Sequence, residues 1–182
     1  MSRSLIAIGL ILIFGWHDRL IAGERIVGAF GLQLGQKSDA ESLKTRTQKR
    51  PGSKFIRFEP ANPVRYFNEY VFGETPISKR ISTIIAMSPY YESLEKCKED
   101  NRGLLLVLER KYGASTKAKT VSVGVWNNRY IFRGRRYIHT GCQIEMGKGY
   151  ILYVQYADGH LNDIREKEQA KMDANSVNSK GL

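Results

Sequence analysis

Two cysteines and one nearby histidine are the residues of this chain best suited to chemistry. Cys97 and Cys142 are its only cysteines, and His139 lies three residues before the second. Such a set could form a disulfide, bind a metal ion or pair a thiol nucleophile with a base. Residues three apart on a strand point to opposite faces, so the spacing of His139 and Cys142 disfavours joint action. His17 and His160 are the remaining imidazoles, and a four-ligand zinc site is therefore hard to assemble.

The elements predicted around the cysteines favour a structural disulfide. Cys97 belongs to an apolar stripe at helical spacing, together with Tyr91, Leu94, Leu105, Leu108 and Tyr112. Cys142 shares one face of a predicted strand with Ile138, Thr140 and Ile144. If that helix packs across that sheet, both thiols point into one layer and pair in an oxidising compartment. Free buried thiols and a catalytic or metal-binding cysteine are the alternatives.

The sequence contains no recognisable catalytic motif. It has neither a G-x-S-x-G nucleophile elbow nor a phosphate-binding loop that ends in G-K-[ST]. A cleft built from Glu59, Glu69 and Glu74 could hold paired carboxylates, but exposed strand charges are the simpler interpretation. We therefore expect a protein that is not an enzyme, with no catalytic residue, no metal site and no small-molecule cofactor.

The basic charge is the strongest hint of a binding function. The formal net charge is +11, and the segment from Arg110 to Ile144 holds eight Lys or Arg and no Asp or Glu. A basic balance favours acidic partners, and Arg and Tyr are common in binding surfaces. The residues that we expect to contact the partner lie on two predicted strands: Arg129, Tyr130, Arg133, Arg135 and Arg136.

The apolar run from Leu5 to Trp16 has the features of a secretory signal peptide. Twelve helical residues cover roughly 18 Å, whereas the hydrocarbon core of a bilayer is roughly 30 Å thick. Arg3 precedes the run and a polar stretch, HDRLIAGER, follows it. We predict that residues 1–22 form a signal peptide, which is removed by cleavage after Ala22 or Gly23. The mature chain is then expected to be periplasmic or secreted and not to span the membrane. An uncleaved anchor or a buried core segment is the alternative.

The remaining pattern predicts an α+β fold. A single, largely antiparallel sheet carries a long helix on one face, and a second helix follows at 159–177. Ser88 and Pro89 suit the start of the long helix and Gly113 its end, while residues 101–103 could kink it. The strands are expected at 25–35, 54–60, 66–74, 80–87, 120–126, 129–133, 136–146 and 150–156. Turns are expected at 75–79, 127–128 and 147–149. The single domain covers residues 23–175, and residues 176–182 form a disordered tail.

Several short motifs carry a resemblance. They are GAFGLQLG, then F-x-x-Y-x-F-x-x-T-P-I-S-K-R-I, then a helix with Cys97 that ends in L-x-x-K-Y-G, then Cys142 and V-Q-Y-A-D. In these motifs the chain resembles a loose group of small, uncharacterised exported proteins of Gram-negative bacteria. The resemblance spans most of residues 26–165. It implies a periplasmic location and a helix-to-strand disulfide, and it implies no activity.

These observations lead to one expected function and to alternatives. We expect a small periplasmic binding protein that acts through a protein–protein interaction, as enzyme inhibitors and immunity proteins do, on an acidic partner. The alternative is a basic module that binds nucleic acid or an anionic envelope polymer. A membrane-tethered accessory protein would require that the segment from Leu5 to Trp16 be retained.

Overall fold

The computed structural model describes residues 23–38, 46–49, 55–118 and 124–178. The predicted signal peptide at 1–22 and most of the predicted strand at 120–126 lie outside the described residues. No described helix combines the length and the apolar character needed to cross a bilayer.

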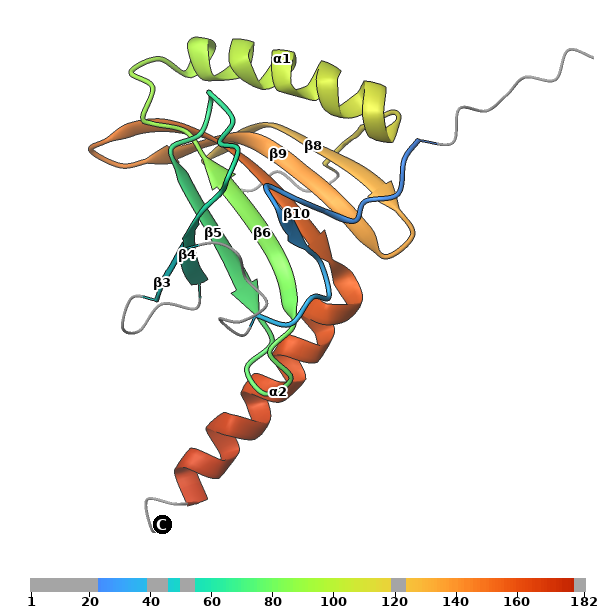
Figure 1. Cartoon of the computed structure of the whole chain (residues 1–182). Coiled ribbons are helices and arrows are strands. Elements are labelled where there is room, and N and C mark those ends of the chain that lie inside the picture. Colours follow the sequence, from blue (N-terminus) through green and yellow to red (C-terminus); the bar gives the residue numbers. More distant parts are fainter. Residues whose placement is uncertain (1–22, 39–45, 50–54, 119–123, 179–182) are drawn as a thin grey trace, which may run out of the picture.

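The architecture is an α+β fold built on one antiparallel sheet (Figure 1). Eight strands follow the order β3-β4-β5-β6-β10-β9-β8-β7. Their bounds are β3 Arg46–Lys49, β4 Phe55–Glu59, β5 Glu69–Glu74, β6 Ile81–Met87, β7 Thr116–Lys117, β8 Val125–Arg133, β9 Arg136–Glu145 and β10 Gly149–Asp158. A small hairpin, β1 Gly28–Ala29 and β2 Leu32–Gln33, forms a separate two-stranded sheet. The helices are α1 Leu94–Tyr112 and α2 Gly159–Asn178. The predicted fold class is confirmed.

The sheet consists of two meanders joined at its centre. Strands β3 to β6 form the first and β7 to β10 the second, and β10 pairs with β6 along Tyr153↔Met87 to Ala157↔Thr83. The predicted turns at 75–79 and 147–149 do connect neighbouring strands. Since α1 lies between the two meanders in sequence, the chain leaves the sheet after β6 and returns at the opposite edge.

The core lies on the face of the sheet that α1 covers in part. Fully buried side chains on this face include Phe72, Ile84, Leu152 and Val154. The β1–β2 hairpin covers the remainder, and the ring of Phe30 meets Phe67, Tyr70 and Tyr156 edge-on at 5.1–6.1 Å between centroids. Edge-to-face aromatic packing of this kind stabilises a core beyond its buried area.

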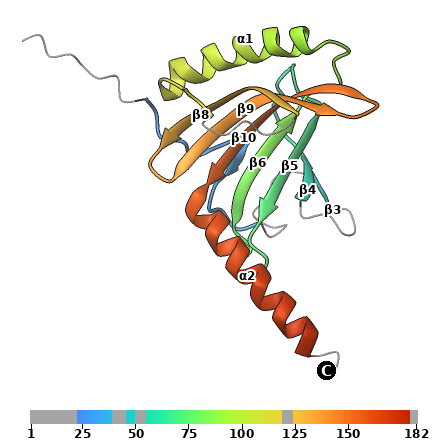
Figure 2. The ribbon, with the colours of Figure 1, turned by 180° about the vertical axis from the view of Figure 1, so that it is seen from behind.

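The helix α1 crosses β8, β9 and β10 at one end of the sheet, whereas α2 leaves the other end (Figures 1 and 2). The residues of α1 that are buried against the strands are Cys97, Asn101, Leu108 and Tyr112. Cys97 forms a disulfide with Cys142 of β9, with a Cα–Cα distance of 6.1 Å. The predicted pairing is therefore confirmed.

The predicted start of α1 at Ser88 and Pro89 is wrong. The helix begins at Leu94, and the Ser93 side chain caps it by accepting from the Lys96 N–H. Residues 88–91 instead continue the sheet: the N–H of Ser88 donates to the Leu152 carbonyl, and Leu152 N–H donates back to the Ser88 hydroxyl, both at 2.9 Å. Tyr91 and Tyr150 then exchange two backbone hydrogen bonds. A good local capping sequence was overridden by pairing with β10.

Residues 101–103 do not interrupt the helix. Asn101 is fully buried, its amide donates to the Asn127 carbonyl at 3.0 Å, and its side-chain oxygen accepts from the Thr140 hydroxyl at 2.8 Å. A buried amide with both ends satisfied is stable at this position, whereas an unsatisfied one would be costly. Asn101 thus extends the contact stripe of α1 by one turn beyond Cys97.

The helix α2 is long, polar and mostly outside the sheet. Its first turn packs beside β6, where the Thr83 hydroxyl donates to Asn162 at 3.1 Å, and its second half extends away from the domain (Figure 1). It reaches Asn178, so three residues of the expected tail are helical, and residues 179–182 lie outside the described residues.

Removal of the disulfide should reduce the stability of the fold without changing it. The bond closes a loop with a sequence separation of 45, for which chain-entropy models give about 4 kcal/mol. We expect the Cys97→Ala/Cys142→Ala variant to unfold in urea with a free energy lower by up to about 4 kcal/mol. A reductant should lower the wild-type midpoint and leave that of the variant unchanged. An equal midpoint for wild type and variant would contradict a stabilising role.

Candidate functional site

The five residues predicted to contact a partner lie in three different places. Arg133, Arg135 and Arg136 surround the hairpin turn between β8 and β9. Tyr130 lies on the face of the sheet opposite to α1, and Arg129 lies beside α1 in the middle of β8. They do not form one continuous strip along the two strands.

Arg136 has a structural role. Its Nε donates to the Asp158 carboxylate at 3.0 Å, and its two terminal nitrogens donate to the backbone carbonyls of Ile26, at 2.9 Å, and Leu34, at 3.2 Å. One guanidinium thereby ties β9, β10 and the segment around β1 and β2 together. Only a planar group with several fixed donors can make such a set of bonds. We therefore remove Arg136 from the candidate contact residues.

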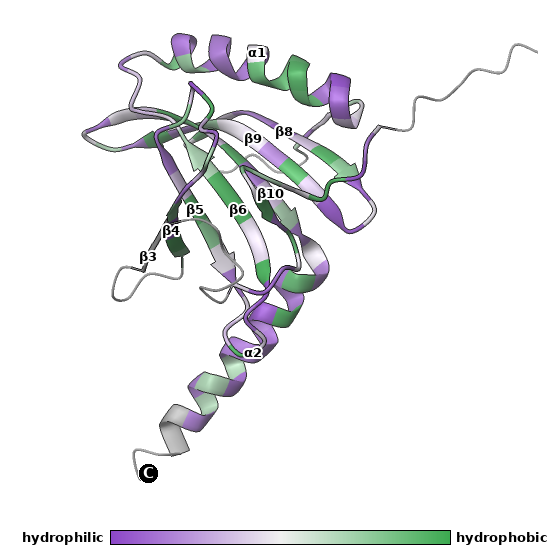
Figure 3. Cartoon of the chain, viewed as in Figure 1, coloured by the Kyte–Doolittle hydropathy of each residue, from purple (hydrophilic) through white to green (hydrophobic). Residues whose placement is uncertain are grey.

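The other two arginines of the turn line a basic groove. It has a volume of about 820 Å³, and its lining includes Arg25, Arg133, Arg135 and His160. Arg25 and Arg135 are exposed, and an Arg135 terminal nitrogen lies 3.1 Å from Nδ1 of His160. The acidic residue of the groove, Asp158, is already paired with Arg136. The tip of the β8–β9 hairpin is accordingly strongly hydrophilic (Figure 3). We call this site the Arg135 groove.

Arg133 is less available than its neighbours. Its guanidinium donates to the Phe132 carbonyl at 2.8 Å and lies against Gly113 at the C-terminal end of α1. A Cβ added at Gly113 would come within 2.0 Å of an Arg133 nitrogen, and the φ of Gly113 is +88°. The positive φ requires glycine there, and the missing side chain leaves room for the guanidinium. A cation near the end of a helix is also favoured by the helix dipole.

Tyr130 belongs to a group of aromatic rings on the sheet face opposite to α1. Its ring stacks on His139 with centroids 4.2 Å apart and on Phe132 at 5.6 Å. The Tyr153 hydroxyl lies 2.8 Å from Nε2 of His139, which also contacts the Asn128 side chain. Burial raises the pKa of Tyr130 and lowers that of His139 to about 4, although a hydrogen bond between His139 and Gln155 opposes the second shift. His139 is therefore neutral at pH 7.

His139 and Cys142 face opposite sides of the sheet, as their spacing predicted. Cys142 is bonded to Cys97 on the α1 side, whereas His139 lies among the rings of the other side. Among the residues that the structure describes, no three His, Cys, Asp or Glu side chains are placed to hold a metal ion. The suggested carboxylates are dispersed: Glu69 pairs with Arg57, and Glu74 with Lys79 at 3.1 Å.

Comparisons with family models, with curated proteins and with solved structures find no significant match.

The sequence did not identify two members of the Arg135 groove. Arg25 and His160 are 110 and 25 positions from Arg135. They meet it because the segment before β1 and the first turn of α2 both end beside the β8–β9 hairpin. The sequence has no periodic pattern that predicts contacts between such distant residues. The only signal was the basic residue Arg25 at the start of a short predicted strand.

Protonation of His139 should destabilise the fold in mildly acidic solution. An unfolded histidine titrates near pH 6.5, and the folded pKa is about 4, so the unfolded chain binds more protons between these values. The contribution of His139 is fully present above pH 6.5 and is lost as the pH falls towards 4. We expect the urea midpoint of the wild type to fall more between pH 7.5 and 5.0 than that of His139→Gln. Equal losses in the wild type and in His139→Gln would contradict the assignment.

Proposed function

We propose that this protein is a small, non-enzymatic binding protein that recognises an acidic surface of another protein through the Arg135 groove. The observation that carries the proposal is the convergence of Arg25, Arg133 and Arg135 on one groove whose acidic residue, Asp158, is already neutralised. Inhibitors and immunity proteins act in this way, without a catalytic centre of their own.

The groove suits carboxylates of a folded partner. Arginine offers a fork of donors that matches a carboxylate in two parallel hydrogen bonds, and it is enriched among residues that dominate interface energetics. Exposed Val27 lines the same groove, so an apolar contact is available beside the charges. The combination of charges with an exposed apolar side chain resembles a protein interface more than a row of cations that contacts only phosphates.

A periplasmic or secreted location is part of the same proposal. The disulfide between Cys97 and Cys142 is consistent with an oxidising compartment. The apolar segment from Leu5 to Trp16 supports export, and the resemblance to small exported proteins points to the periplasm. The acidic partner would accordingly be an envelope or extracellular protein.

The alternative ligand is an anionic polymer, and the salt dependence of the binding affinity distinguishes it from a protein partner. A protein that neutralises several phosphates loses about 10³-fold or more in affinity between 50 and 200 mM salt. A packed protein interface with a few arginine contacts responds less, because part of its affinity comes from apolar burial.

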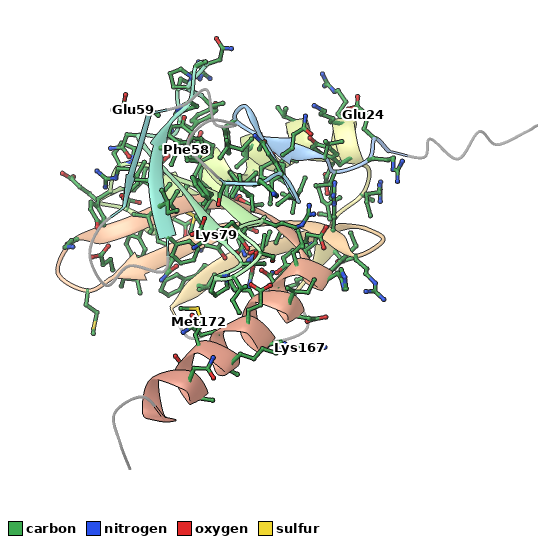
Figure 4. The ribbon with its side chains drawn as sticks, turned by 60° about the horizontal axis from the view of Figure 1, so that its bottom comes forward. Glu24, Phe58, Glu59, Lys79, Lys167 and Met172 are labelled. Carbon is green, nitrogen blue, oxygen red and sulfur yellow. A yellow bond between two sulfur atoms is a disulfide. The ribbon has the colours of Figure 1, made fainter. Side chains whose placement is uncertain are left out.

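Charge reversal in the groove should abolish partner binding. We expect immobilised wild-type protein to retain a protein from an envelope extract of the source organism, and the Arg25→Glu/Arg135→Glu variant to retain at least about tenfold less of it. Both side chains are exposed, so the fold should survive, as circular dichroism can verify. The matched control is Lys167→Glu/Lys171→Glu, which makes the same charge change on exposed residues of α2; Figure 4 shows Lys167 on that helix.

Two results would overturn the proposal. One is a set of retained proteins that is the same for the groove variant and the wild type. The other is retention of nucleic acid or polysaccharide instead of protein, with a steep loss of binding at higher salt, which would establish the polymer alternative.

A further inference from the structure

A second basic cavity lies between α1, β7 and β8, away from the Arg135 groove. Its volume is about 340 Å³, within the range of sites for small molecules. The described residues that line it are Lys98, Arg102, Lys117, Ala118, Val125, Trp126, Asn127, Asn128 and Arg129. None of these is acidic, and none lines the Arg135 groove.

A β-bulge builds one wall of this cavity. Trp126 pairs with Cys142 and Arg129 pairs with Thr140, so three steps along β8 correspond to two along β9. In a regular strand Trp126 and Arg129 would point to opposite faces, but the extra residue turns both towards the side that carries α1. Asn128 points the other way, where its side chain meets His139.

A side chain of α1 holds the bulge in place. Asn127 has a φ of +53°, a conformation that Asn tolerates better than most residues. Its carbonyl accepts from the buried amide of Asn101, which is itself held by the Thr140 hydroxyl. The disulfide fixes the same helix one turn earlier, at Cys97. Trp126 and the basic residues of α1 are therefore held at a fixed separation.

The cations around the cavity have few internal partners. Lys98 pairs with the exposed Glu95 at 2.8 Å. Within the described residues, the side chains of Arg102, Lys117 and Arg129 make no hydrogen bond or salt bridge with another side chain, and Arg102 interacts electrostatically with the exposed Glu95. Because like charges repel, an anion bound among these side chains would be stabilised by them and would relieve their repulsion.

One of the residues that line the cavity, Trp126, is aromatic. Trp126 is half-buried, and its ring meets that of Tyr150 edge-on at 5.7 Å between centroids. Tyr150 thus restrains the indole, which offers apolar surface to a planar group beside the cations. Phosphate with a flat ring attached would satisfy both parts of the cavity.

We propose that this cavity is a binding site for a small aromatic phosphate, with Arg102, Lys117 and Arg129 on the phosphate and Trp126 against the ring. The proposal does not depend on the partner of the Arg135 groove, because the two sites share no lining residue. Failure of one experiment therefore leaves the other intact.

Calorimetric titration of the full-length protein with three probes tests the site. We expect phenyl phosphate to bind, inorganic phosphate to bind about tenfold more weakly, and phenol not to bind measurably. Arg102→Gln/Arg129→Gln should weaken phenyl phosphate binding by about tenfold for each lost charge-assisted hydrogen bond. Trp126→Leu should weaken phenyl phosphate and leave the affinity for inorganic phosphate unchanged.

The control variant is Arg110→Gln/Lys167→Gln, which removes two exposed charges that do not line the cavity. It should bind phenyl phosphate as the wild type does. The proposal is wrong if phenyl phosphate does not bind at millimolar concentration, or if this control loses as much affinity as the cavity variant. Equal affinity of wild type and Trp126→Leu for phenyl phosphate would refute the role of the ring.

Discussion

The attachment of α1 to the second meander is the constraint on which the rest of the structure depends. Two successive turns of the helix make it: Cys97 is bonded covalently to β9, and Asn101 is hydrogen-bonded to β8 and β9. The first is strong and indifferent to solvent, whereas the second is directional and tolerates no other side chain of that size. Together they fix both the position and the rotation of the helix.

This attachment also determines what the surface can do. The amide of Asn101 holds the carbonyl of the bulged Asn127, and the bulge in turn decides which face of β8 receives Trp126 and Arg129. On the opposite face the same shift brings Tyr130 over His139. One irregular residue thus places Trp126 and Arg129 on one side of the strand and Tyr130 with His139 on the other. The hydrogen bond between Asn101 and Asn127 therefore both holds the helix and shapes the surface.

The sequence predicted the parts of the fold that depend on local pattern. Alternation in β5, β6 and β9, the turns at 75–79 and 147–149, and the facing of Cys97 and Cys142 required only periodicity. The errors arose where distant strands decided the outcome. Ser88 was predicted to start the helix, but it pairs with β10. Asn127 and Asn128 were predicted to form a turn, but they lie in a bulge within β8. Asn tolerates a positive φ, and the chain does adopt one here. Since a tight turn and a β-bulge both use this conformation, the residue type alone does not distinguish them.

The arginines show why charge along a sequence does not predict a binding surface. Arg133, Arg135 and Arg136 are neighbours in sequence, yet Arg136 is used within the fold, Arg133 is packed against Gly113, and Arg135 is open to solvent. Conversely, Arg102 and Arg129 are remote in sequence and line one cavity. A cation with a partner contributes to stability, whereas clustered cations without partners reduce it. Local features that oppose folding are expected at functional sites, where a ligand compensates them. Within the described residues, the two basic sites are therefore distinguished by cations that distant segments bring together, with few acidic residues among those that line each site.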